Sequence, residues 1–357
     1  MKSLDELLVC EKNIANSSFV LFRLPHTEEY QVILQQNPPK TFLDLNEIDG
    51  LKGFLIAPFN PSNTSPYIFL EGQTLMIKQS GKTKDFTLGI QEITDNGRGS
   101  YEKAFKEIQE ELQIKKYKKI VLARTEEVEL NKYTLSHIIS TFQKACRIYP
   151  NSYVALWNTP TTGLWLTATP ELLLRKNEDH WESMALAGTM SIEDKECLRL
   201  SNWSDKNKRE QEYVSQYIEE QLITHTNHLC KSDTYPTICG KLIHLRTDFK
   251  FQINETSSPL KVLINLHPTP AICGIPTIET HNTIIKNEQV PRKYYCGFSG
   301  PLNQSEISFY VTLRCLNINK SKAVFYAGGG ILPESKLQEE WEETERKLNT
   351  MKDLFEE

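Results

Sequence analysis

Residues 336–351 read KLQEEWEETERKLNTM, a pattern that predicts an amphipathic helix packed against the body of the protein. The apolar residues recur at helical spacing and form one stripe, made of Leu337, Trp341, Leu348, Met351 and, further on, Phe355. Beside this stripe, Glu343 and Lys347 lie about 60° and 20° from Glu340 on the helical wheel. Carboxylates at the edge of a core are costly unless they meet a cation or hydrogen-bond donors. The helix is therefore either a solvated, self-paired face or one wall of a site for a cation and an anion.

The composition is that of a globular protein large enough to bury a substantial core. The 357 residues are 39% apolar and 24% charged, and the formal net charge is -5. The basic residues are scattered along the chain, so we expect no nucleic-acid partner and no attraction to an anionic membrane. The expected partner is a small molecule, and nothing in the sequence specifies more than a monomer or a weak homodimer.

Cysteine usage and the N-terminal residues predict a cytoplasmic location. The 8 cysteines include no CxxC pair and form no dense framework, which favours reduced thiols. The apolar run in MKSLDELLVCEK is broken by Asp5 and Glu6, so it lacks the core of a signal peptide. No stretch approaches the roughly 18 apolar residues of a membrane helix.

Strand and helix patterns alternate along the chain and predict one α/β or α+β body with layered sheets. We expect residues 1–95 to form a strand-rich part of this body and residues 96–357 to form the catalytic region. The expected strands are 19–23, 30–34, 53–58, 67–70, 74–78, 119–130, 153–157, 164–169, 171–176, 181–186, 244–247, 309–316 and 323–326. The expected helices start near residue 100 and then span 135–146, 204–225, 258–266, 280–286 and the final segment. Residues 190–202 read as a polar loop and 267–276 as a proline-rich turn.

The helix over 204–225 carries a glutamate on its apolar side. Glu210 falls on the stripe of Val214, Tyr217, Ile218 and Gln221. One inward glutamate here, together with Glu340 and Glu343, suits a hard divalent ion such as Mg²⁺. The alternative is that Glu210 pairs with Lys or Arg near the start of its own helix.

Two further residues are candidates for proton transfer. Lys119 opens the strand KKIVLART, whose faces are apolar, so the lysine can lose solvation and act as a base. The alternative is that it reaches the surface, and neighbouring Lys118 leaves the choice of residue open. Glu171 follows Pro170 and precedes three leucines in TPELLLRK, a setting that raises the pKa of a carboxyl and keeps it protonated as an acid.

The remaining candidates are basic, aromatic or glycine residues near strand ends. In FYVTLRCL, Arg314 is expected on one strand face with Tyr310 and Thr312, either as a carboxylate clamp or in a buried ion pair. Tyr326 and the glycines 328–330, expected between a strand and a polar turn, would allow close backbone approach to a ligand. His244 can orient polar groups or be a core histidine. The set His225, His228 and Cys230 matches no common zinc spacing and is expected at a helix end.

Eight segments in one order resemble the chorismate-utilising enzymes, most closely the isochorismate synthases. They are TPELLLRK, ALAGT, DKNKREQE, HLRT, LHPTPAICGIP, TLRC, YAGGGILPES and EEWEETERKL, within about residues 118–355. GFLIAPF at 53–59 is a weaker match. The resemblance implies the anthranilate synthase component I-like fold, a large single domain of layered, mainly antiparallel sheets flanked by helices.

The same resemblance implies roles for the candidate residues. Magnesium would be held by Glu210 and Glu343 with Glu340 as an accessory ligand, Lys119 would activate water, and Glu171 would be the general acid. Other matched positions imply contact with the substrate chorismate, at Gly188, Thr189, His244, Arg314, Tyr326, Gly328 and Lys347. The implied reaction is attack of water on the second ring carbon, with loss of the fourth-carbon hydroxyl, to give isochorismate for menaquinone or siderophore synthesis.

The resemblance leaves alternatives. Asn207 stands where relatives often carry an acid, and Met190 and Ser191 follow AGT where many ammonia-using relatives have an arginine-rich continuation. Lys119 argues against the anthranilate branch, which lacks this lysine, whereas aminodeoxychorismate and salicylate synthases retain it. The alternatives are therefore a salicylate synthase, an ammonia-using chorismate aminase or an inactive chorismate-binding protein.

Overall fold

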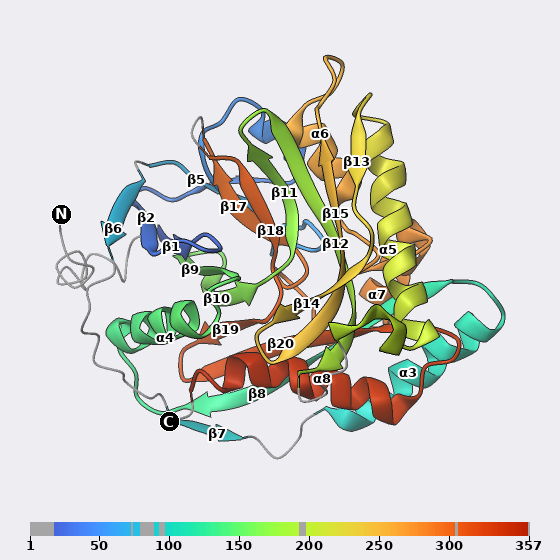
Figure 1. The fold of residues 1–357 in the computed structure, drawn as a ribbon. Coiled ribbons are helices and arrows are strands. Elements are labelled where there is room, and N and C mark those ends of the chain that lie inside the picture. The colour runs from blue at the N-terminus through green and yellow to red at the C-terminus, as the bar shows by residue number, and fades with distance from the viewer. Residues whose placement is uncertain are drawn as a thin grey trace.

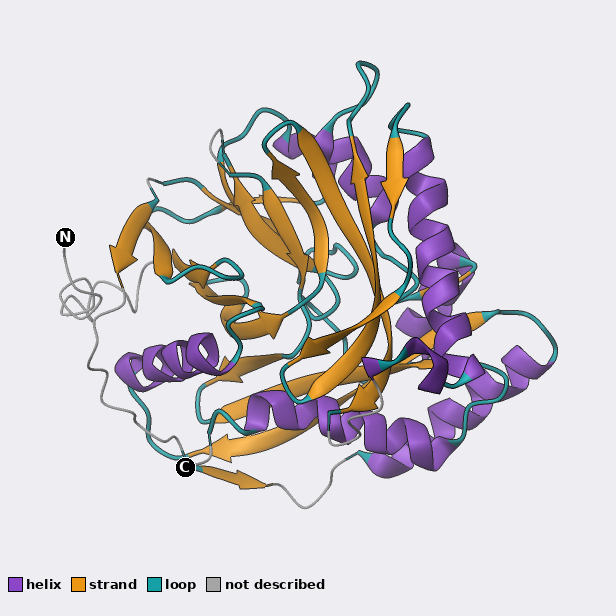
Figure 2. Cartoon of the chain, in the orientation of Figure 1, coloured by secondary structure: helices purple, strands orange, loops and turns teal. Residues whose placement is uncertain are grey.

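Two antiparallel sheets of ten strands each form the body of the protein (Figure 2). The computed structural model describes residues 18–72, 74–78, 89–92, 97–192, 198–303 and 306–355. The expectations for the first twelve residues and for part of the 190–202 loop therefore lie outside the described residues. Every pairing between described strands is antiparallel, as predicted for layered sheets.

The first sheet has the order β16-β8-β20-β19-β10-β9-β1-β2-β6, with β7 beside β8. Its strands are β1 (Ser18–Arg23), β2 (Glu29–Gln35), β6 (Leu75–Lys78), β7 (Ile90–Glu92), β8 (Lys119–Leu130), β9 (Tyr153–Thr159), β10 (Gly163–Thr169), β16 (Gly274–Ile275), β19 (Cys315–Asn319) and β20 (Lys322–Ile331).

The second sheet has the order β13-β15-β12-β11-β18-β17-β4-β5-β3, with β14 beside β15. Its strands are β3 (Lys40–Phe42), β4 (Gly53–Ala57), β5 (Tyr67–Leu70), β11 (Leu172–Asn177), β12 (His180–Ser191), β13 (Leu229–Lys231), β14 (Tyr235–Cys239), β15 (Leu242–Phe251), β17 (Phe298–Leu302) and β18 (Ser308–Val311). The N-terminal strands thus join both sheets, while the functional division near residue 95 stays a prediction.

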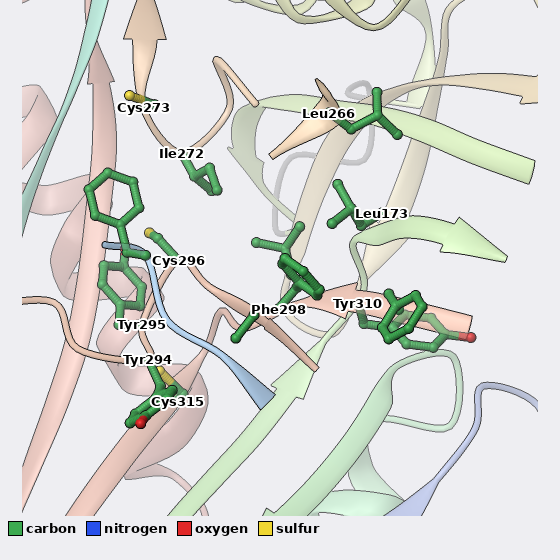
Figure 3. Packing of buried hydrophobic residues seen from close by; sticks show 14 of the residues in the cluster. Leu173, Leu266, Ile272, Cys273, Tyr294, Tyr295, Cys296, Phe298, Tyr310 and Cys315 are labelled. Carbon is green, nitrogen blue, oxygen red and sulfur yellow. The ribbon is translucent and has the colours of Figure 1, made fainter. Parts of the chain in front are cut away.

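The main core lies between the facing sheets. Tyr153 of β9 stacks on Tyr310 of β18, with ring centroids 4.5 Å apart and planes 7° from parallel. Phe22 of β1 meets Phe54 of β4 at 5.0 Å. Figure 3 shows Tyr310 in the same buried cluster as Tyr294, Tyr295, Cys296 and Phe298. Aromatic contacts between sheets add to the burial of apolar area and fix how the two sheets are aligned.

Helices cover the outer surfaces of both sheets (Figure 1). They are α3 (Arg98–Gln113), α4 (Leu135–Ile148), α5 (Asp205–Ile223), α6 (Pro259–Leu266), α7 (Thr277–Asn287) and α8 (Leu337–Lys352), with short turns of 3-10 helix at Leu45–Ile48 and Leu200–Asn202. The predicted stripe of α8 is buried through Leu348 and Met351, which pack in one cluster with Phe325 of β20. In the described part of the chain, no helix combines the length and apolarity that crossing a membrane requires.

The chain changes sheet at two neighbouring connections. Pro170 and Glu171 carry it from β10 to β11, and residues 312–314 carry it from β18 to β19. The two connections are joined by backbone hydrogen bonds, from Val311 N–H to the Glu171 carbonyl and from Ala168 N–H to the Arg314 carbonyl, both 3.0 Å long. One side chain from each connection therefore reaches the same end of the interior.

Three predictions about strands were wrong. Residues 309–316 do not form one strand, because the chain switches sheet and Arg314 takes a φ of 45°, so Arg314 does not share a strand face with Tyr310. The glycines 328–330 do not follow a strand but lie within β20, where Gly328 and Gly330 pair with Ala123 and Val121 of β8. Strand β12 also continues to Ser191, into the segment expected to be a polar loop.

Candidate active site

Most of the predicted site residues line one cavity of about 60 Å³ at the sheet-switching connections. It is bordered by Glu171, Gly188, Thr189, Glu210, His244, Arg314, Tyr326, Gly328 and Lys347. The other three, Lys119, Glu340 and Glu343, stand next to its wall at the glycines of β20. A space of this size holds a few water molecules.

Lys119 and Glu210 form a buried ion pair. The Lys119 side chain is 0% exposed, and its Nζ lies 2.9 Å from Glu210 Oε1. Lys118 is exposed, so the structure distinguishes between the two lysines and excludes surface exposure of Lys119. Glu210 is paired, as the alternative reading expected, but with a lysine of β8 rather than with one near the start of α5.

Glu340 and Glu343 project from α8 toward Gly329. A Cβ built on Gly329 would stand 3.3 Å from Glu340 Oε2 and 3.7 Å from Glu343 Oε1. Glu343 accepts a hydrogen bond of 2.6 Å from Lys347, which lowers the pKa of Glu343 although burial acts in the opposite direction. Burial and the neighbouring Glu343 raise the pKa of Glu340, which is 1% exposed. The two carboxylates on this helix are therefore held in different electrostatic settings.

Lys206, in the first turn of α5, is a residue that the sequence analysis missed. Its ammonium donates a hydrogen bond to Glu340 Oε1 across 134 positions of the chain. Burial opposes its charge, but Glu340 first and then Glu210 raise the pKa of Lys206 well above the ordinary value. Its position four residues before Glu210 was the available signal, because these two positions share a helix face.

The three glutamates offer the kind of ligand atoms that magnesium prefers. Glu210, Glu340 and Glu343 supply carboxylate oxygens from two helices, which hard divalent ions prefer. Glu340 Oε2 is buried and not fully satisfied by hydrogen bonds of the described chain, as expected for an atom that a cation would satisfy. Within the described ranges, no group of three acidic, His or Cys side chains stands close enough to hold an ion as placed. Each of the three glutamates is paired with a lysine instead.

Glu171 is a buried carboxyl among cations. It is 3% exposed, and burial raises its pKa from 4.5 to about 7, although Lys119, Arg314 and Lys347 act to lower it. A carboxyl with this pKa is protonated in a large fraction of molecules near neutral pH and can donate a proton.

His244 and Arg314 are joined by a hydrogen bond that fixes the histidine tautomer. His244 Nδ1 lies 2.8 Å from the Gly188 carbonyl, which can only accept, so Nδ1 carries the proton. Nε2 then accepts from Arg314 Nη2 at 3.1 Å. Burial and Arg314 lower the pKa of His244 to about 3, so the ring is neutral. Gly188 stands at a bulge of β12 with a φ of 68°, which directs its carbonyl at His244.

Two tyrosines form another wall of the cavity. Tyr326 stacks on Tyr295, with ring centroids 5.4 Å apart, and both line the cavity. The sequence analysis missed Tyr295, whose hydroxyl lies 2.9 Å from the position of a Cβ built on Gly328. Lys347 Nζ donates to the Gly328 carbonyl at 2.8 Å, which holds its ammonium at the cavity.

The structure also shows where Asn207 and His225 lie. Asn207 lies against Gly188, since a Cβ on that glycine would be 3.3 Å from Asn207 Cβ. His225 is buried beyond the end of α5 and its ring nitrogens contact Ser257 at 2.5 Å and Asn265 at 2.9 Å. The sequence predicted a surface helix end for His225, His228 and Cys230; the helix end is confirmed, and His228 and Cys230 are exposed, but the surface position is wrong for His225, which is buried.

A family model described as chorismate binding enzyme matches residues 67–356. The chain belongs to this family of chorismate binding enzymes. The resemblance predicted from eight ordered segments is thereby confirmed.

Curated relatives of this family member include isochorismate synthases. Isochorismate synthase EntC of Escherichia coli (strain K12) is 32% identical over 200 residues, 54% of this chain and 51% of that protein. The vibriobactin-specific isochorismate synthase of Vibrio cholerae is 24% identical over 319 residues, 86% of this chain and 80% of that protein. The chain thus spans about half the length of several curated relatives that it matches.

Solved structures of relatives confirm the predicted fold. MenF, the menaquinone-specific isochorismate synthase from Escherichia coli, superimposes with a TM-score of 0.78 at 22% identity, covering 95% of this chain and 89% of that one. Anthranilate synthase component I from Streptococcus pneumoniae superimposes with a TM-score of 0.71 at 13% identity, covering 94% and 90%.

Proposed function

We propose that this protein is an isochorismate synthase, which converts chorismate to isochorismate with Mg²⁺. The observation that carries the proposal is Glu171, a buried carboxyl that lines one cavity with Arg314 and Lys347, while Lys119 stands next to the cavity wall. Burial raises the pKa of Glu171 to about 7. A chain of the chorismate binding enzyme family that keeps both an acid and a lysine base is suited to exchange a ring hydroxyl.

The cations of the cavity would hold the carboxylates of chorismate. Arg314 forms no ion pair with a carboxylate of the described chain, and its guanidinium is oriented by His244. A partly buried guanidinium with only a neutral partner favours an anionic ligand. Lys347 and the backbone at Gly328 lie near enough to one another to complete a pocket for the enolpyruvyl carboxylate.

In the proposed reaction, a hydroxyl from water is added at the second ring carbon and the hydroxyl of the fourth ring carbon is lost. The substrate and the product therefore have the same atomic composition. Lys119 acts as the neutral amine, so it must first give up its proton and its ion pair with Glu210. Its amine then takes a proton from a water molecule, whose oxygen bonds to the second ring carbon. The ring double bonds shift, and the bond from the fourth carbon to its hydroxyl breaks. Glu171 donates a proton to that hydroxyl, which departs as water, so one water is consumed and one is released. Gly188, Thr189 and His244 would border the ring during this step.

Magnesium would be held by Glu210 and Glu343, with Glu340 beside them. Bound there, the ion would neutralise the ring carboxylate and fix its position. A substrate dianion and a divalent cation together add no net charge to the cavity. This balance suits a site in which glutamates and basic side chains are already matched.

Incubation of the purified protein with chorismate and MgCl₂, followed by chromatography of the products, tests the proposal. We expect isochorismate, and we expect none from Lys119→Ala, in which the base is removed. Salicylate, an amino-chorismate formed with added ammonia, or no turnover would each contradict the assignment. The last result would favour the inactive chorismate-binding alternative if chorismate still binds.

A further inference from the structure

Lys206 places one ammonium among three carboxylates. It donates to Glu340 Oε1 and also lies close enough to Glu210 and Glu343 to be stabilised by their charges. Its side chain is 21% exposed, whereas that of Glu340 is 1% exposed. The charge of Lys206 therefore reaches the buried cluster from the direction of solvent.

The other two lysines of the cluster have separate tasks. Lys119 pairs with Glu210 and is the proposed base, and Lys347 pairs with Glu343 and borders the cavity. Lys206 does not line the cavity, and its ammonium donates a hydrogen bond to Glu340. Its position therefore points to the carboxylates rather than to a substrate.

We propose that Lys206 is a built-in counter-cation that stabilises the carboxylate cluster without metal and competes with Mg²⁺ for it. The inference rests on the proposed function only in that the glutamates form the metal site. A buried, unpaired carboxylate is destabilising, so a protein without bound metal needs a positive charge at Glu340. Two cations at one cluster repel each other, and the flexible stem of Lys206 allows its ammonium to withdraw toward solvent.

Titration of the intact protein with MgCl₂ alone, followed by calorimetry, tests this competition. Lys206→Met keeps an unbranched stem of similar length and removes the charge. We expect it to bind Mg²⁺ at least about fivefold more tightly than the wild type, because the metal no longer displaces an ammonium. Without metal the variant should unfold at a lower temperature, and saturating MgCl₂ should restore most of that loss.

Lys208→Met is the matched control, because Lys208 lies on the same helix and forms no ion pair in the described chain. It should leave the dissociation constant for Mg²⁺ unchanged. Lys206→Arg retains the charge and should show no gain in affinity, which provides a second variant if Lys206→Met fails to fold.

Unchanged or weaker Mg²⁺ binding by folded Lys206→Met would overturn the proposal, since Lys206 would then support the metal rather than compete with it. A gain of fivefold or more by Lys206→Arg would overturn it as well. Calorimetry with MgCl₂ needs no turnover, so failure of the proposed isochorismate synthase activity would be seen separately in the product assay.

Discussion

At Gly330, one added methyl group should lower the activity of the protein while leaving its folding intact. A Cβ built there would stand 2.2 Å from Glu210 Oε1 and 2.6 Å from Lys119 Cε. Ordinary contact begins near 3.4 Å, so the Glu210 oxygen must retreat by about 1.2 Å in Gly330→Ala. Both neighbours are the far ends of flexible side chains, so the backbone of β20 need not move. A misplacement of about 1 Å at reacting groups costs roughly 100-fold in rate, or about 2.7 kcal/mol.

The assay is kcat/KM for conversion of chorismate to isochorismate, measured beside the thermal unfolding temperature. We expect about a 100-fold loss of kcat/KM in Gly330→Ala with the cooperative unfolding transition retained. Gly329→Ala should lose less, because its Cβ would lie 3.3 Å from Glu340 Oε2. Gly99→Ala, with no atom within 4 Å of the new Cβ, is the control and should be fully active. Full activity of Gly330→Ala, or a larger loss in Gly329→Ala, would refute this account of the cluster.

Four further outcomes follow from Glu171 and Arg314. Glu171→Gln should lower kcat by about 10²- to 10⁴-fold, and a loss below tenfold would count against its role as the acid. In the wild type, kcat/KM should fall as pH rises above about 7, where Glu171 of the free enzyme loses its proton; a flat kcat/KM from pH 6 to 9 would contradict this. Because folding raises the pKa of Glu171 from 4.5 to about 7, its contribution to stability is lost as pH rises across that interval. Urea unfolding at pH 9 should then find Glu171→Gln more stable than the wild type by up to about 3 kcal/mol, whereas at pH 4 the gain should vanish. Arg314→Lys should raise KM by roughly 10- to 100-fold with a smaller change in kcat, since a lysine cannot contact both His244 and a carboxylate as a planar fork does.

The inward glutamates were predictable because helical periodicity specifies a face. Glu210 and Glu340 fall on or beside apolar stripes, and both are buried in the structure. The strand at Lys119 was also predictable, since it opens on an apolar run, Ile120 to Ala123, and then continues with polar residues interrupted by Val128 and Leu130. In each case the periodicity of the helix or strand determines the direction in which a side chain points. Packing of the sheets and helices then brings these side chains together.

The prediction for Arg314 was wrong because the alternation of side chains along a strand does not indicate where the chain passes from one sheet to the other. The run from 309 to 316 is mostly apolar with no glycine or proline to mark a break, and the change of direction appears as a positive φ at Arg314. The glycines of β20 were misplaced for a different reason. Glycine disfavours strands on average, but here the side chains of Glu210 and Lys119 occupy the space above Gly330. At Arg314 and at the glycines of β20, tertiary packing therefore overrides the local conformational preference of the residue.

The role proposed for Lys206 could not be predicted from the sequence pattern of its own helix. Its spacing from Glu210 is visible in the sequence, yet a lysine in the first turn of a helix is usually solvated. Its function depends on Glu340, which is 134 residues away and is brought near only when α8 packs against β20. Because α5 covers the second sheet and α8 the first, the ion pair between these residues joins the helices of both layers. A charge that balances the cluster is thus specified by the fold as a whole, and a helical wheel of either helix alone cannot identify it.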